Sequence, residues 1–519
     1  MNVGAPHPLS GVTNRRSRSW YADARRRRPL LQFFPPPGTL PGVSHTSGPQ
    51  TSVYDLGIWI VSQTVMSARG QIVLDSLQRT SGDRNRTFVL RGGYVLSMDP
   101  SIGNFVGNVV VQAGTITAVG PNATAGADAI QIDVAGSIVM PGFVDSHLHA
   151  WEGQLRSLAP DLSLDDYNVL VHQRLAPHYR ADDMRVGNLV TALQCLSAGV
   201  TCLIDNSHNS RSADHSNAAV EGLQRAGIRA VHASGAPLAG DWDQQWPEDL
   251  HRLRSEYFHS DDQLLTLRMF AGRPDIDVWT FAIQNDLWIS TEMRGWFWSD
   301  ALSGLLNEHH TFNHCSGMPP EAWEVIRDFG VTVNMASRSD TTFGIGPTSL
   351  PVDQALDYGI RPGLSMDNEI CYAIDMFSEM RLLLHMQRAE AQRRLAAGED
   401  GPLPVTVHDV LEFATIGGAV NAGLDHRIGS LTPGKAADVI IVGTEGVNST
   451  PLASVVSAAV SFVNPSNVEA VFVAGEVRKW NGALVGHDLR GVRGMAEASR
   501  DRLLKASGLT LDRFSSAPL

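Results

Sequence analysis

The chain has 519 residues, of which 43% are hydrophobic and 18% are charged, and its formal net charge is −13 at pH 7. This composition is ordinary for a globular protein, and the length exceeds one average domain, although a barrel of roughly 250 residues or more can form a single unit. Seven arginines and one acid fall within the first 40 residues, so the rest of the chain is more acidic than the total indicates. An acidic body argues against nucleic acid as a partner.

The four cysteines show neither a paired framework nor CxxC spacing. We therefore expect a reducing, cytoplasmic setting. No apolar run reaches the ~20 residues of a membrane span, so no membrane partner is expected. The arginine-rich start meets three prolines before an apolar stretch adequate for an export signal develops.

Residues 1–86 differ in composition from the rest of the chain. They are rich in arginine and proline and end in the polar run "RTSGDRNR". We expect a disordered or dispensable extension here. Short β-rich runs with glycine turns follow at 87–140, and they predict the first part of a β-sandwich.

From 141 to 425, short apolar runs alternate with helical stretches. A first strand ends near His147, and seven further strands are expected at 199–205, 229–234, 264–270, 287–293, 310–315, 331–336 and 361–367. Eight strands alternating with helices predict an α/β protein with a (β/α)₈ TIM-type barrel. Residues 426–490 return to strands and glycine turns, which predicts the second part of the sandwich, and 491–519 are expected to form a C-terminal helix and tail.

Two histidines one residue apart lie in "VMPGFVDSHLHAW", at the end of the first predicted strand. A strand places residues i and i+2 on one face, so His147 and His149 aim at the same point. His314 closes the sixth predicted strand and Asp367 the eighth, and barrel active sites lie at these strand ends. A lone histidine there is more often a satisfied polar residue, but four such residues in this order favour a metal site.

These residues lie in motifs that resemble the amidohydrolase superfamily, especially its branch of cytosine deaminases and triazine hydrolases of the atrazine chlorohydrolase type. The resemblance also rests on "NHCSGMPPEAWEVIRDFGVTVNMASRSD", "GIRPGLSMDNE" and "IGSLTPGKAADVIIV", and it covers about 87–487. It implies a metal-dependent barrel flanked by a β-sandwich that both ends of the chain build. It also implies one divalent transition metal, with zinc expected and iron or manganese as alternatives, and a homodimer.

Residue by residue, the resemblance assigns roles at the strand ends. His147 and His149 match the first two metal ligands. Asp367 matches the aspartate that binds the metal and takes the proton from the attacking water, and His314 matches the histidine that orients that water or the substrate. Imidazoles and a carboxylate suit a divalent transition ion, which lowers the pKa of a bound water towards ~7.

The fifth strand, "DLWISTEMRG", departs from the family pattern. Mononuclear members usually carry a ligand histidine there and a catalytic glutamate three residues later. In this chain Glu292 stands about where the histidine would fall, and Gly295 stands three residues further on. Three interpretations stay open. Glu292 is a metal ligand with a catalytic role; it faces solvent or pairs with Arg294, and the metal is weak or absent; or the strand is misaligned with the family pattern.

Without the usual glutamate, another group must protonate the leaving group of a deaminase substrate. The candidates near the expected mouth of the barrel are Glu152, Asp205, His208 and Glu369. We expect Glu152 and His208 to bind substrate. Trp151 and Trp298 are expected to form flat pocket walls for an aromatic or heteroaromatic ring, the alternative being that they pack in a lid or in the core.

Together these residues predict a metal-dependent amidohydrolase or deaminase-like enzyme that hydrolyses a non-peptide C–N or C–X bond of a cyclic small molecule. The altered fifth strand leaves a second hypothesis open, a cyclase, dehydratase or decarboxylase that uses the metal as a Lewis acid. A third is a barrel that has lost catalysis and serves as a scaffold. Retention of His147, His149, His314 and Asp367 argues against the scaffold, which has no physical need for all four.

Overall fold

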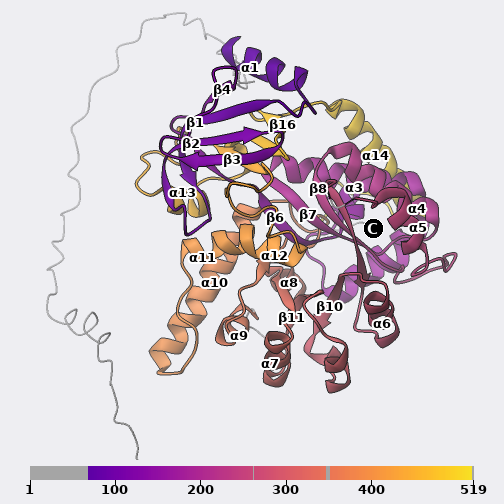
Figure 1. The fold of residues 1–519 in the computed structure, drawn as a ribbon. Coiled ribbons are helices and arrows are strands. Elements are labelled where there is room, and N and C mark those ends of the chain that lie inside the picture. The colour runs from indigo at the N-terminus through magenta and orange to yellow at the C-terminus, as the bar shows by residue number, and fades with distance from the viewer. Residues whose placement is uncertain (1–67, 261, 346–350, 517–519) are drawn as a thin grey trace, which may run out of the picture. The chain divides into compact units, whose positions relative to one another are not determined.

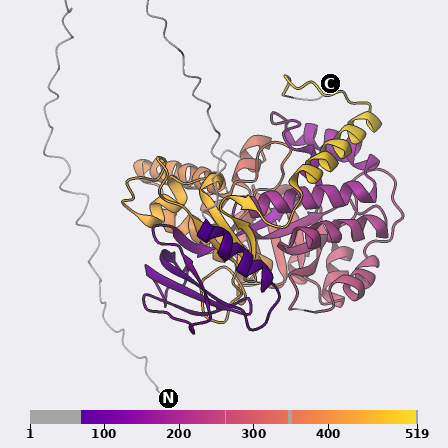
Figure 2. The same ribbon diagram turned by 90° about the horizontal axis from the view of Figure 1, so that it is seen from above.

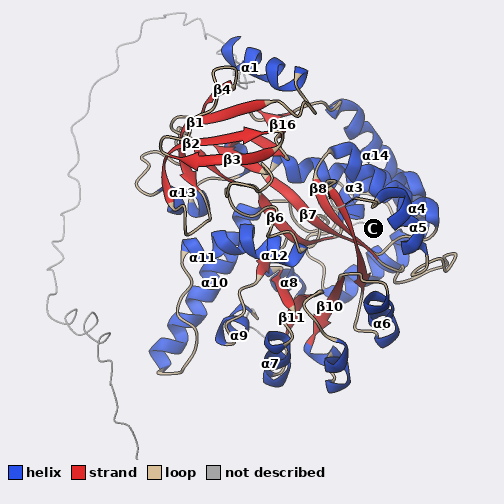
Figure 3. Cartoon of the chain, viewed as in Figure 1, coloured by secondary structure: helices blue, strands red, loops and turns tan. Residues whose placement is uncertain are grey.

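Two β-sheets organise residues 68–260, 262–345 and 351–516, which are the residues described by the computed structural model (Figures 1 and 3). One sheet is the barrel and the other belongs to the sandwich. Residues 1–67 lie outside the described part, so the predicted disorder of the N-terminal extension stays a prediction there.

The barrel sheet has eight parallel strands that follow one another in chain order. They are β6 (Phe143–Leu148), β7 (Val200–Ser207), β8 (Arg229–Ser234), β9 (Leu265–Ala271), β10 (Ile289–Arg294), β11 (His310–Ser316), β12 (Thr332–Met335) and β13 (Gly363–Leu364). A parallel bridge between Leu148 and Asp367 brings the first strand beside the end of the eighth. The predicted barrel is confirmed, and each of its strands overlaps the predicted range.

Helices follow the strands and cover the outside of the barrel (Figure 1). The α-helices are α2 (Leu164–Tyr167), α3 (Ala181–Ser197), α4 (Ala213–Ala226), α5 (Asp249–Tyr257), α6 (Ile276–Gln284), α7 (Pro320–Asp328), α8 (Ser337–Phe343), α9 (Val352–Asp357), α10 (Met376–Ala397), α11 (Val407–Glu412) and α12 (Gly418–Ala422). The 3₁₀ helices are η1 (Ala150–Leu155), η3 (Ala176–His178), η4 (Gly295–Phe297) and η5 (Asp300–Leu305), and the π helices are η2 (Asn168–Leu175) and η6 (Phe413–Gly417). Helix α4 is terminated by the following residue, Gly227, whose φ of 71° is the left-handed conformation that glycine adopts without strain.

The second sheet is built from both ends of the described chain, as the resemblance implied. Its strands are β1 (Thr87–Leu96), β2 (Asn104–Gln112), β3 (Thr115–Gly120), β4 (Ile130–Asp133), β5 (Ile138–Pro141), β14 (Val439–Val442), β15 (Val468–Val473), β16 (Glu476–Trp480) and β17 (Ala483–Leu484). The two halves meet where β14 pairs antiparallel with β5, with Ile440 opposite Met140. Phe88 stacks on Phe472 across this core, with ring centroids 5.2 Å apart.

The packed structure begins earlier than the predicted boundary at residue 87. Helix α1 (Ala68–Arg79) buries Leu74 and Leu77 in the sandwich core. Arg86 donates two hydrogen bonds to the carboxylate of Glu476, at 2.6 and 3.1 Å. Leucines three residues apart lie on one helical face, and this spacing within 68–79 is what the compositional argument overlooked.

A buried ion pair connects the barrel to the second sheet. Arg229 of β8 donates to both carboxylate oxygens of Asp438, at 2.7 and 3.0 Å, and both side chains are at most 2% exposed. The short elements α13 (Val455–Ser461) and η7 (Pro465–Asn467) lie between β14 and β15. The last described helix is α14 (Leu489–Ala506), which begins two residues before the range of 491–519 expected for a C-terminal helix and tail. Figure 2 shows α14, in yellow, against helices of the first part of the barrel. Among the described helices, none combines the length and apolarity that crossing a membrane requires.

Candidate metal centre

The main chain brings the ends of the first and eighth barrel strands together. The amide of Asp367 donates to the carbonyl of His147 at 2.9 Å, and the amide of His149 donates to the carbonyl of Asp367 at 2.7 Å. This alternation places all three side chains at one barrel mouth. Asp367 has a φ of 63° and His314 a φ of 67°, conformations that cost energy outside glycine and often mark functional sites.

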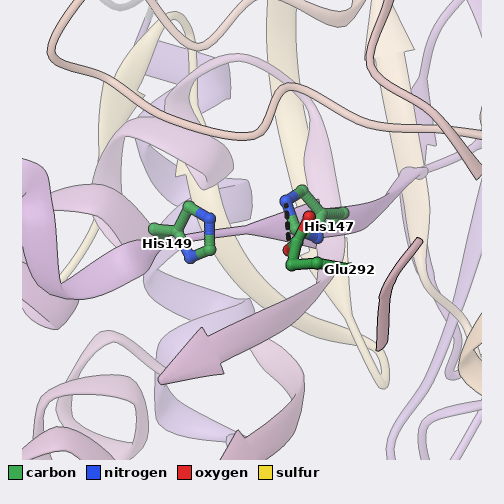
Figure 4. A group of neighbouring side chains, drawn as sticks. All are labelled: His147, His149 and Glu292. Carbon is green, nitrogen blue, oxygen red and sulfur yellow. Dashed lines mark ion pairs between the residues drawn. The ribbon is translucent and has the colours of Figure 1, made fainter. Parts of the chain in front are cut away.

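Imidazole nitrogens and carboxylate oxygens alternate around a common centre. The Nε2 atom of His147 lies 2.9 Å from Oδ1 of Asp367 and 3.5 Å from Oε1 of Glu292, and Nε2 of His149 lies 3.2 Å from the same Asp367 oxygen. Ligand atoms on a tetrahedral zinc ion, at about 2.0–2.1 Å from the metal, would be about 3.3 Å apart. Figure 4 shows the Glu292 carboxylate beside His147, with His149 nearby. The donor set and its spacing therefore fit a divalent transition ion.

Glu292 reaches the centre from β10, the fifth barrel strand. Its Oε2 lies 3.0 Å from Nε2 of His314, whereas the nearest nitrogen of Arg294 is 3.9 Å from the same oxygen. Burial opposes ionisation of Glu292, but the neighbouring His147 and His314 hold its pKa below the ordinary range. The Glu292 carboxylate thus lies closer to the histidines of the centre than to Arg294. Both the histidines and Arg294 are near it, as the first two interpretations of the sequence required.

His314 lies between two carboxylates. Its Nδ1 donates to Oδ1 of Asp340 at 2.7 Å, and its Nε2 faces Glu292. Burial disfavours the charged ring, yet Asp340 and Glu292 together raise the pKa of His314 to about 10. Asp340 was not predicted as a site residue, although it is the last residue of the sixth-to-seventh strand motif.

A cavity of about 210 Å³ opens onto the centre. Its aromatic walls are Tyr167, Phe270, Phe297 and Phe343. The predicted tryptophans are not among its lining residues. Trp151 is fully buried, with its ring centroid 5.1 Å from that of Tyr179, because the turn η1 directs it into the core. Trp298 packs half-buried against the barrel core, so the alternative of core packing holds for both.

The four polar candidates divide into two pairs. Asp205 is bonded to His232 at 3.0 Å and Glu369 to Arg156 at 2.5 Å, so both carboxylates are occupied away from the cavity. His208 lines the cavity, and its Nε2 is 3.0 Å from Nδ1 of His149.

Glu152 does not line the cavity, but it is one hydrogen bond away from it. Its Oε1 accepts from the Tyr167 hydroxyl at 2.6 Å, and Tyr167 is a cavity wall. Burial raises the pKa of Glu152 to about 7. The predicted contact of Glu152 with substrate is thus at most indirect, through Tyr167.

Position 295, where the family places its glutamate, has no room for a side chain. A Cβ added to Gly295 would lie 1.9 Å from the carbonyl oxygen of Gly317 and 2.5 Å from its carbonyl carbon. Both are main-chain atoms, so the clash cannot be relieved by a rotamer change. The absence of the glutamate is therefore built into the packing of the ends of β10 and β11.

Comparison with known proteins supports the same assignment. Residues 303–478 match the model of the amidohydrolase family. The resemblance inferred from the motifs is thereby confirmed, and it extends over most of the chain in individual relatives.

Two curated relatives illustrate that extent. A 5'-deoxyadenosine deaminase from Methanosarcina mazei is 28% identical over 421 residues, which are 75% of this chain and 92% of the relative. A 5-methylthioadenosine/S-adenosylhomocysteine deaminase from Syntrophobacter fumaroxidans is 26% identical over 432 residues, or 76% and 93% of the two chains.

Solved structures share the fold at lower identity. An adenosine deaminase from Xanthomonas campestris with bound zinc superposes with a TM-score of 0.70 at 21% identity, covering 81% of this chain and 99% of that one. Atrazine chlorohydrolase from Arthrobacter aurescens complexed with zinc gives 0.68 at 20% identity, covering 80% and 100%.

Proposed function

We propose that the chain is a metal-dependent hydrolase that cleaves a C–N bond, or a related C–X bond, of a cyclic heteroaromatic small molecule. The convergence of His147, His149, Glu292 and Asp367 at 2.9–3.5 Å carries the proposal. Zinc is the proposed ion, because two solved structures with this fold hold it. When bound, the ion supplies Lewis-acid activation of water and substrate.

The residues around the centre have distinct proposed roles. Asp367 accepts the proton of the attacking water, and the hydroxyl of Ser339 donates to its Oδ2 and holds the carboxylate in place. Asp340 and Glu292 favour the protonated ring of His314, so this ring can stabilise negative charge that develops on the substrate. His208 contacts the substrate from the cavity wall.

Deamination also requires a proton for the departing amine. Gly295 cannot supply it, and the hydrogen-bonded pair of Tyr167 and Glu152 is the proton source that we propose instead: Tyr167 gives its hydroxyl proton to the amine and takes one from the protonated carboxyl of Glu152. The curated relatives are named as deaminases of adenine-containing compounds, so such compounds are the first substrates to test. Triazines form the second group, because a halide leaves without needing a proton. The predicted homodimer and cytoplasmic setting stay predictions.

Metal content and turnover test the proposal together. The purified chain should contain about one equivalent of zinc, iron or manganese by mass spectrometry, and His147→Ala should lose it. His251→Ala is the control, because His251 lies on α5 and is exposed. A product of 5'-deoxyadenosine or of a chlorotriazine that contains ¹⁸O from labelled water would support hydrolysis. Turnover that leaves no ¹⁸O in the product would favour the lyase or cyclase hypothesis. If the purified chain holds no metal even after incubation with zinc, iron or manganese, the proposal is contradicted.

A further inference from the structure

One buried residue, Asn206 of β7, touches both histidines of the paired motif. Its main-chain carbonyl oxygen lies 3.0 Å from Nδ1 of His149. Its side-chain amide lies against Nδ1 of His147. Asn206 is fully buried, so neither contact competes with solvent. Both contacts are made at the ring nitrogen that points away from the centre.

The contact with His149 fixes where its ring carries a proton. Nδ1 of His149 lies 3.0 Å from this carbonyl oxygen and also 3.0 Å from Nε2 of His208. A carbonyl oxygen only accepts hydrogen bonds, so Nδ1 of His149 is assigned as the donor and Nε2 of His208 as a second acceptor. A neutral ring then has its lone pair on Nε2, which faces Asp367 at 3.2 Å. Two acceptors at that distance need a cation between them, either a proton on the ring or a metal ion.

The contact with His147 has two forms, because an amide carries a donor and an acceptor of nearly equal size. With Nδ2 towards the ring, Nδ1 of His147 accepts, and the ring proton sits on Nε2, where it bonds Asp367 at 2.9 Å. In this form Oδ1 of Asn206 is buried and has no hydrogen-bond partner among the described residues. If the amide turns over, Oδ1 accepts from Nδ1, and the Nε2 lone pair points at the centre.

We infer that Asn206 is a positioning residue that sets the tautomers of His147 and His149 for metal binding, and that its amide turns over when the ion binds. The inference rests on the proposed function. It follows from three observations: one residue serves both rings, its carbonyl permits one tautomer of His149, and its amide oxygen is left unpaired in the orientation that opposes binding at His147. Groups that orient ligand histidines in this way typically change metal affinity 10–100-fold when mutated.

Two substitutions of similar size separate positioning from packing. Asn206→Leu removes both side-chain polar atoms, and Asn206→Asp keeps an acceptor towards Nδ1 of His147. We expect a 10–100-fold loss of zinc affinity in the leucine variant, measured by competition with a chromophoric chelator, and wild-type or tighter affinity in the aspartate variant. Asn188→Leu is the matched control, because Asn188 is fully buried in α3 and donates to the Met184 carbonyl.

The outcomes distinguish this inference from the proposed function. Wild-type protein that binds no zinc would contradict the proposed function itself. Wild-type protein that binds zinc, with Asn206→Leu binding it equally tightly, would overturn only the role of Asn206. If the leucine variant does not fold, the aspartate variant decides: a folded Asn206→Asp that loses zinc affinity overturns the inference, and one that retains it supports the acceptor role.

Discussion

Gly295→Ala is expected to damage the centre although no catalytic atom is removed. The new Cβ would lie 1.9 Å from the Gly317 oxygen, whereas ordinary contact begins at 3.4 Å, so the ends of β10 and β11 must separate by about 1.5 Å. These strand ends carry Glu292 and His314. Overpacking typically lowers the free energy of unfolding by about 1–3 kcal/mol. Because the clash here is with main-chain atoms, we expect a loss of about 3 kcal/mol for Gly295→Ala. A displacement of 1 Å in an active site can cost about 10²-fold in rate.

Urea denaturation and steady-state kinetics with a substrate found by screening would test this expectation. Gly304→Ala is the control, because a Cβ there would meet no atom within 4 Å, and we expect its stability to be unchanged or raised by up to about 1 kcal/mol. Gly295→Glu adds the carboxylate that the family places at this position. A Gly295→Glu variant with wild-type stability and higher deaminase activity would refute the argument that packing excludes the residue.

Three further substitutions test the fold and its response to pH. Asp438→Asn should lower the free energy of unfolding by about 3–5 kcal/mol, because it leaves Arg229 buried without its carboxylate, and a normal urea midpoint would contradict this. Burial, with the charge of neighbouring His149, lowers the pKa of His172 to about 3, so the native state should lose stability as the pH falls from about 6.5 towards 3, at up to about 1.4 kcal/mol per pH unit. His172→Phe should flatten that part of the profile, and an unchanged slope would refute the assignment. Arg86→Ala should speed hydrogen exchange in residues 68–79, because Arg86 donates to the Leu77 carbonyl of α1 and to Glu476, whereas wild-type exchange would show that α1 is held by its leucines alone.

The sequence sufficed for the barrel because the alternation of strand and helix is a local pattern. Most barrel strands contain a short β-branched or apolar run, and the shared end of the barrel then follows from topology. Even β13, only two residues long, could be located because Asp367 follows it in a recognisable motif. The ends of the second sheet were assigned in the same way, from glycine turns and short strands.

The substrate pocket was less accessible to such reasoning, because side-chain direction at the mouth depends on loop conformation. Trp151 follows the histidine motif directly, yet a turn sends it into the core, and Tyr167 forms the wall instead. Asn206 had no sequence signal of its own, and Asp340 ended a recognised motif that did not indicate its role. Each acts by facing a histidine far away in the sequence, and only the closed barrel reveals that contact.

If Glu292 is a metal ligand, as proposed, it changes the net charge of the centre. The ligand set that the resemblance implies, three imidazoles and one carboxylate, leaves a divalent ion with one net positive charge, whereas Glu292 in place of one imidazole brings the sum to zero. A carboxylate in place of an imidazole also suits manganese better. His314, which lies 3.0 Å from Glu292 and is bonded to Asp340, restores a positive charge beside the centre when its ring is protonated. The proposed function would therefore divide electrophilic stabilisation between a bound ion and His314, so His314→Gln should reduce turnover far more than metal content.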